Sequence, residues 1–367
     1  MRLLFRPIPY DGESAASFLI RAAEENGHSS VYRLFAAIGI QINEPTLRAC
    51  IIDRHRYRIL IQSLGLSADA AKLALPRIST SRRSPRLYHS MAIPDRCFRR
   101  DDARAFCSQC LTEKPYWRQQ WLVRPFSACT DHQCLLVDRC EKCGKAPSIG
   151  RGELTTCDHC EASLLIMHGP PVTDSAMVAV QGMLKSKSAD SLGKVLDFWG
   201  ALVRFDGLDD SPATEHTRLN LSVSFLNGER TAFDHVAALV IQRLATMGPG
   251  IQLLPFLSGS PMLKSFAEEV LTHVWPLVQA GAGDARLSRL SKGEVCTLLN
   301  MSYFKLTQLI KSSQIHWPSN DGRQQKIAAT ENELRQHGFS ETEILYATAE
   351  EIDAPLRRRY KPGRRGQ

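Results

Sequence analysis

Cysteine and histidine residues in one stretch of this chain form four pairs, Cys107-x₂-Cys110, Cys129-x₂-His132, Cys140-x₂-Cys143 and Cys157-x₂-Cys160. In each pair the two side chains lie three positions apart, so a tight turn can direct both at one metal ion. Thiolate sulfur and imidazole nitrogen are donors that Zn²⁺ prefers, and two such turns supply four tetrahedral ligands. The spacing therefore predicts two structural Zn²⁺ sites in series, the first Cys₃His and the second Cys₄.

Other interpretations of these cysteines are weaker. Isolated cysteines are most often small buried hydrophobic side chains, but seven of the eleven cysteines fall at paired spacing in this stretch. A disulfide framework needs an oxidising compartment, and we expect no signal peptide before the chain. A catalytic zinc site keeps one coordination position open, whereas each predicted site has four protein ligands.

Two details of the ligand set stay open in the sequence. Cys134 follows His132 by two residues and could replace it, although His132 matches the spacing of the other three pairs. The pairs could also be interleaved, the first with the third and the second with the fourth. Consecutive pairing closes shorter loops, and it is the arrangement that we expect.

The composition is that of a folded protein of two or three domains. The chain has 367 residues, of which 43% are hydrophobic. No apolar run reaches the roughly 18 residues of a membrane-spanning helix. We therefore expect a location in the bacterial cytoplasm, where thiols stay reduced and available for metal, and no membrane partner.

Positive charge is concentrated in two places. The net charge is +8, and the last eleven residues carry six basic side chains and no acidic one. Residues 76–125 carry eleven basic and four acidic side chains. A phosphate-rich partner is the natural inference, because neutralising phosphates releases counterions. A solvated surface with a disordered basic tail is the alternative.

The first hundred residues predict a small helical domain of the helix-turn-helix type. Apolar residues recur at helical spacing after residue 12, and further helices are expected across 31–38, 46–64 and 67–75. Glu13, Ser17 and Arg21 share one helix face, where an exposed ion pair of little energetic value is the ordinary interpretation. Residues 77–86 are polar and basic and predict a linker.

Between the first two ligand pairs, Trp117 and Trp121 lie four residues apart. A small zinc module needs apolar mass, so we expect both indoles to pack against the zinc loops, with base stacking as the lesser alternative.

The C-terminal part predicts further helices and a DNA-binding motif. Helical periodicity is clear over residues 192–203, 233–244 and 263–277. Residues 292–299 and 303–312 predict a helix, a tight turn and a second helix, and residues 314–327 predict a hairpin wing. The residues that we expect to contact nucleic acid or a partner are Ser302, Tyr303, Lys305, Gln308, Lys311, Arg323, Lys326, Arg357, Arg358 and Arg359.

The predicted fold is therefore mainly α-helical, with two tandem zinc-finger modules between helical domains. We expect five segments: an N-terminal domain with its basic linker (1–100), the zinc modules (101–168), a helical domain (169–290), a winged helix-turn-helix-like module (291–345) and a basic tail (346–367). No phosphate-binding loop, dinucleotide fingerprint, nucleophile elbow or acidic two-metal cluster is evident. We therefore expect no enzymatic activity.

Two signatures together resemble one protein family. The first runs from Pro7 to Gly27 and contains Glu13-Ser14, Ser17-Phe18-Leu19, Arg21 and Asn26-Gly27. The second is the zinc stretch, with Phe106-Cys107, Cys110-Leu111, the tryptophan-bearing insert and Cys129-Thr-Asp-His132. With these two signatures, residues 5–165 resemble TniQ/TnsD proteins. At this length the chain is most similar to the short TniQ of type I-F CRISPR-associated transposons.

The resemblance implies a target-selection protein of a transposon that does not itself cut DNA. The short branch implies a homodimer that joins a type I-F Cascade complex with its guide RNA to an AAA+ transposition regulator. Sequence specificity would then lie in base pairing with the guide. The TnsD-like branch implies direct recognition of an attachment site in DNA. The basic tail is compatible with such direct contact.

Overall fold

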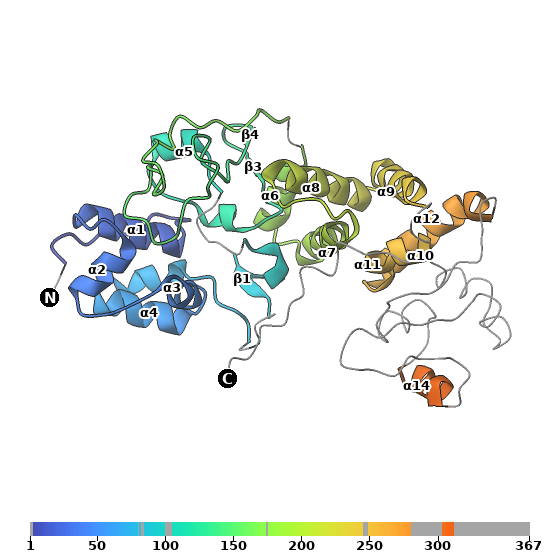
Figure 1. The fold of residues 1–367 in the computed structure, drawn as a ribbon, viewed down its shortest axis with the longest axis horizontal. Coiled ribbons are helices and arrows are strands. Elements are labelled where there is room, and N and C mark those ends of the chain that lie inside the picture. Colours follow the sequence, from blue (N-terminus) through green and yellow to red (C-terminus); the bar gives the residue numbers. More distant parts are fainter. Residues whose placement is uncertain are drawn as a thin grey trace. The chain divides into compact units, whose positions relative to one another are not determined.

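The computed structural model describes residues 3–79, 81, 84–99, 105–173, 175–244, 249–279 and 303–311. Helices dominate these residues, and their strands form two short antiparallel hairpins, so the predicted mainly α-helical fold is confirmed (Figure 1). The chain divides into two compact units, Met1–Leu196 with Asp209–Val223, and Asp197–Leu208 with Ser224–Gln367. No described helix is both long and apolar enough to span a membrane.

The first unit begins with a helical bundle around α1. Its elements are α1 (Ala15–Glu25), α2 (Val31–Ala37), α3 (Glu44–Ile51), α4 (Arg54–Ser63) and the 3₁₀ helix η1 (Ala68–Leu73). The Ser14 side chain accepts a hydrogen bond from the Ser17 amide and starts α1. Residues 15–23 of α1 are all buried, so this helix is the centre of the bundle rather than a surface helix with one apolar face.

The predicted helix over residues 46–64 is in fact two helices. Asp53 has an extended backbone, and its carboxylate accepts hydrogen bonds from the His55 and Arg56 amides. This cap ends one helix and starts the next within two residues, because it satisfies amides that a continuous helix would have bonded to carbonyls.

The predicted linker over residues 77–86 runs directly into a hairpin. Strands β1 (Arg86–Tyr88) and β2 (Met91–Ile93) pair antiparallel with Leu87 opposite Ala92. His89 and Ser90 both have positive φ angles, 45° and 65°, as the tightest hairpin turns require. Neither residue is the glycine or asparagine that usually marks such a turn, so no sequence pattern predicts this one.

The metal-binding stretch has little regular structure. It contains α5 (Ser108–Glu113), the 3₁₀ helix η3 (Gln119–Leu122), β3 (Ala128–Cys129) and β4 (Cys134–Leu135), and η2 (Asp95–Cys97) lies just before it. Its cysteines share one hydrophobic core with α1 to α4, to which Phe18, Phe35, Trp117 and Trp121 also belong. Both indoles are 2% exposed, so the expectation that they pack within the module is confirmed.

The remaining helices lie after residue 174. They are α6 (Ser175–Lys185), α7 (Ala189–Phe205), α8 (Pro212–Leu226), α9 (Thr231–Gln242), α10 (Pro249–Gln252), α11 (Leu254–Leu257), α12 (Pro261–Gln279) and α14 (Tyr303–Lys311). In the second unit the Phe198 ring contacts those of Phe225, Phe256 and Phe266, with centroids 4.2 to 5.5 Å apart. The three helices that periodicity predicted in this region correspond to α7, α9 and α12.

Candidate metal centres

The first four predicted ligands come together at the start of α5. Cys107 is the N-cap of α5, Cys110 lies in its first turn, Cys129 ends β3, and His132 lies in the turn before β4. Their ligand atoms all lie within 4.8 Å of one another. His132 Nδ1 is 3.5, 3.2 and 3.5 Å from the sulfurs of Cys107, Cys110 and Cys129.

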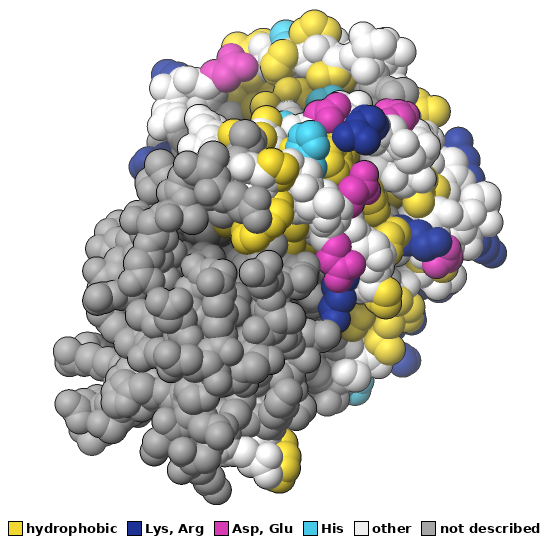
Figure 2. Space-filling view, turned by 90° about the vertical axis from the view of Figure 1, so that its right-hand side faces the viewer, with side chains coloured by type: hydrophobic (Ala, Val, Ile, Leu, Met, Phe, Trp, Pro, Cys, Tyr) yellow, Lys and Arg dark blue, Asp and Glu magenta, His cyan; other side chains and the backbone are white. Residues whose placement is uncertain are grey.

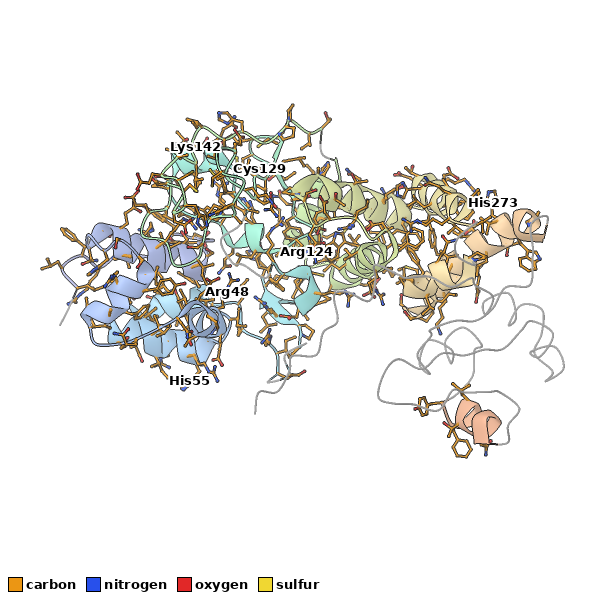
Figure 3. The ribbon with its side chains drawn as sticks, in the orientation of Figure 1. Arg48, His55, Arg124, Cys129, Lys142 and His273 are labelled. Atoms are coloured by element: carbon orange, nitrogen blue, oxygen red, sulfur yellow. The ribbon has the colours of Figure 1, made fainter. Side chains whose placement is uncertain are left out.

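The second group consists of Cys140, Cys143, Cys157 and Cys160, again with ligand atoms within 4.8 Å. The sulfurs of Cys140 and Cys160 are 3.5 Å apart, and those of Cys143 and Cys157 are 3.8 Å apart. The pairs are thus grouped consecutively and not interleaved. Figure 3 labels Cys129 of the first group and Lys142, which lies between Cys140 and Cys143, both in the metal-binding part of the first unit.

Both groups have dimensions that fit Zn²⁺. With sulfur about 2.3 Å from a tetrahedral zinc, neighbouring sulfurs are about 3.8 Å apart, and a nitrogen ligand shortens that edge slightly. The observed separations of 3.2 to 3.8 Å match these edges without rearrangement of the backbone. Two groups of four soft donors at this spacing could each hold one metal ion.

Cys134 lies close to the first group without completing it. Its sulfur is 3.7 Å from that of Cys107. However, the four donors that are all mutually close include His132 and not Cys134. In the hairpin, Cys134 is paired opposite Cys129, so it lies beside the group at the start of β4. The geometry favours His132 as the fourth donor.

Charged residues surround the first group. Glu113 Oε1 is 2.9 Å from His132 Nε2, so the imidazole can donate there and keep Nδ1 free as a metal donor. Arg118 Nη1 contacts both the Cys110 sulfur and the Asp131 carboxylate. Sequence reasoning did not single out Glu113 or Arg118. The only available signal was a cation placed between two tryptophans.

The crowded sulfurs perturb one another. Hydrogen bonds from the thiols of Cys110, Cys129 and Cys134 lower the pKa of Cys107, while its neighbour Cys107 raises the pKa of Cys110. In the second group, burial raises the pKa of Cys157 to about 12. Burial opposes ionisation of Cys140 as well, but backbone amides and Cys160 lower the pKa of Cys140 to about 7. Sulfurs this close do not all ionise together unless a cation compensates them.

A buried ion pair ties the N-terminal signature to this stretch. Arg21 donates from Nε and Nη2 to the two oxygens of Glu13, at 2.9 and 2.8 Å, and Glu13 is fully buried. Ser17 donates to the same carboxylate and accepts from the Trp117 amide. The prediction that this ion pair is exposed is therefore wrong, because the Trp117 loop and the segment before Glu13 cover the pair.

The loop between the two ligand pairs of the second group contacts the N-terminal part of the first unit. Arg151 lies 4.2 Å over the Trp117 ring and is 3% exposed, and burial lowers its pKa to about 10. Gly152 lies against the backbone of Ser29, where an added Cβ would be 2.4 Å from the carbonyl carbon. Such an approach allows only glycine at this position.

The predicted contact residues in the C-terminal region are described in part. Tyr303 and Gln308 are exposed on α14, and Leu306 on the same helix is buried. Lys305 and Lys311 lie within α14. Ser302, Arg323, Lys326, Arg357, Arg358 and Arg359 lie outside the described residues, as do the predicted wing and the basic tail.

The family model for TniQ matches residues 4–136. This part of the chain is therefore called the TniQ domain. The predicted resemblance to TniQ proteins is confirmed over these residues, and it suggests a transposition target-selection protein. No curated protein matches the chain.

The TniQ domain runs from the segment before α1 to β4. It therefore includes the buried Glu13–Arg21 pair and all four donors of the first group. The second group and helices α6 to α14 lie beyond the matched residues, although Arg151 and Gly152 contact the TniQ domain directly.

Proposed function

We propose that this chain is a non-catalytic target-selection adaptor that links a type I-F Cascade complex and its guide RNA to an AAA+ transposition regulator. It would act as a homodimer in the bacterial cytoplasm and direct DNA insertion without cutting DNA. The observation that carries the proposal is the TniQ domain over residues 4–136.

We propose that the two groups hold one structural Zn²⁺ each. Cys107, Cys110, Cys129 and His132 would bind the first ion, and Cys140, Cys143, Cys157 and Cys160 the second. Four protein donors complete a tetrahedral shell and leave no position for a substrate, so the ions would stabilise the fold rather than react. Their energetic role would be to fix the loops on which Trp117 and Arg151 lie.

Co-expression tests the adaptor function. The full chain, produced with the components of a type I-F Cascade complex and its guide RNA, should co-purify with them and capture the AAA+ regulator. A chain that binds neither component would contradict the proposal. Zinc should be measured in the same preparation, because loss of metal would remove binding for an unrelated reason.

A TnsD-like protein that recognises an attachment site directly is the alternative. The exposed Tyr303 and Gln308 of α14, and the six basic residues near the C-terminus, support it. Such a protein should bind naked DNA tightly, with sequence preference and a steep dependence on salt. An adaptor of the first kind should instead show little preference among naked sequences.

A further inference from the structure

Helix α4 presents a row of polar side chains away from the bundle. His55, Arg58, Ile59 and Gln62 follow the spacing i, i+3, i+4 and i+7 and are all exposed, Ile59 by 52%. The opposite face carries the buried side chains Tyr57, Leu60 and Ile61. The row therefore forms one continuous outward strip along the helix.

The exposed surface of α4 on and beside this strip is positive. Arg54, Arg56 and Arg58 lie on α4 together with His55, and the helix contains no acidic residue. Within the described residues, Arg54 and Arg58 have no ion-pair partner, and Arg56 is 3.6 Å from Asp53 in an exposed pair. By contrast, acidic and basic side chains are interspersed among the described residues on the face shown in Figure 2. Exposed cations without an ion-pair partner favour an anionic ligand.

The bundle holds this helix firmly. Helix α4 packs against α3 and η1, and its Tyr57 hydroxyl donates to the Ala15 carbonyl at the start of α1. Only Ile52 and Asp53 separate α3 from α4, so the two helices follow one another across a short turn, with α4 second. DNA-binding helix-turn-helix motifs have the same order of elements, and in them the second helix enters the major groove.

We propose that the outward strip of α4 binds duplex DNA in its major groove. His55, Arg58 and Gln62 would meet base edges, where arginine suits guanine and glutamine suits adenine, and Ile59 would contact a thymine methyl group. Arg54 and Arg56 would contact phosphates and fix the orientation. The inference rests on the proposed role in target selection, since a target-selecting protein has to be held at its target DNA.

Side-chain types on the strip favour duplex DNA over RNA. No tyrosine, phenylalanine or tryptophan is exposed on α4, so the strip lacks the stacking platforms that single strands use. The major groove of duplex RNA is too deep and narrow for side chains to read. A B-form major groove is about 12 Å wide, which matches the diameter of about 10–12 Å of a helix with its side chains.

The test compares two double variants of the full, zinc-loaded chain. The strip variant, Arg54→Ala with Arg58→Ala, removes one charge from the strip and one from beside it. Lys142→Ala with Lys145→Ala removes two exposed charges that belong to neither metal group, and Figure 3 shows Lys142 and His55 at opposite edges of the first unit. Binding of a short fluorescent random-sequence DNA duplex is measured over a series of salt concentrations by anisotropy, with single-stranded DNA and duplex RNA as competitors.

The strip variant should bind the duplex roughly tenfold or more weakly, with a salt slope reduced by about one for each lost phosphate contact. The lysine variant should bind like the wild-type chain. His55→Ala with Gln62→Ala should weaken duplex binding without changing the salt slope, because neither side chain is assigned to a phosphate. Equal melting temperatures show that these surface changes leave the fold intact.

Several outcomes would overturn the inference. These are equal losses in both double variants, binding of the wild-type chain to RNA in preference to DNA, or no DNA binding at all. Loss of Cascade co-purification in the strip variant with unchanged DNA binding would make the strip a protein-docking face. If instead the wild-type chain binds DNA through the strip but never co-purifies with Cascade, the adaptor proposal fails and this inference stands.

Discussion

At the scale of single residues, the buried Glu13 carboxylate has the most partners in the N-terminal signature. It accepts hydrogen bonds from Ser17, from two nitrogens of Arg21 and from the Tyr10 amide. Ser17 then accepts from the Trp117 amide. The residues of the signature therefore have a structural role: their hydrogen bonds connect α1 to the metal-binding stretch, and they do not form a ligand-binding surface.

Replacing Glu13 by Gln should strongly destabilise the first unit. The change removes the buried ionic partner of Arg21 and leaves only the exposed Glu25, and breaking a buried pair costs about 3–5 kcal/mol. Chemical denaturation monitored by circular dichroism measures the effect. Glu25→Gln is the matched control, because Glu25 pairs with the same arginine at 40% side-chain exposure, and its loss should cost about 0.5 kcal/mol or less. Similar losses in both variants would contradict this account.

His132 and Cys134 can be distinguished by metal content. His132→Ala should lower the zinc content of the purified chain from two ions to one, because it removes a donor from the group that fits tetrahedral coordination. Cys134→Ser should keep both ions. Elemental analysis by mass spectrometry provides the measurement, and the reverse result would identify Cys134 as the ligand.

At the scale of elements, the ligand pairs were predictable and their connections were not. A pair such as Cys140 and Cys143 is a local turn, so its spacing alone indicates what it does. The Ser17–Trp117 hydrogen bond joins residues one hundred positions apart, and no local pattern indicates it. The β1–β2 hairpin was missed because its turn is formed by His89 and Ser90. The strip on α4 has a helical period, but its exposure depends on which face the bundle buries.

The contact between the Gly150–Gly152 loop and α2 gives a prediction at this scale. Gly152→Ala places a Cβ 2.4 Å from the Ser29 carbonyl carbon, and the resulting backbone shift should destabilise the chain by about 1–3 kcal/mol. Gly182→Ala in α6 is the control. Nothing lies within 4 Å of the added Cβ there, so alanine should stabilise that helix by up to about 1 kcal/mol. Thermal melts of the two variants should therefore shift in opposite directions, and a shift in the same direction would show that the loop can move aside.

At the scale of the whole molecule, the question is whether the N-terminal helices fold without metal. The expected boundary near residue 100 separates these helices from the zinc modules, and it stays a prediction. However, Cys107, Cys110, Cys140 and Cys157 belong to the same hydrophobic core as α1 to α4. Metal binding is coupled to folding wherever the ligands are part of the core.

Removing metal with a chelator should therefore expose α1 to α4 together with the metal-binding loops. Without cations the clustered thiolates repel one another, and the Trp117 loop that covers Glu13 and Arg21 loses its anchor. Helices α9 and α12 of the second unit should keep their protection, because their core is built from Phe233, Phe266 and similar apolar side chains. Hydrogen exchange resolved by peptide mass spectrometry measures each segment separately. If α1 to α4 instead stay protected after chelation, the helices form an independent domain, and the boundary near residue 100 is a true folding boundary.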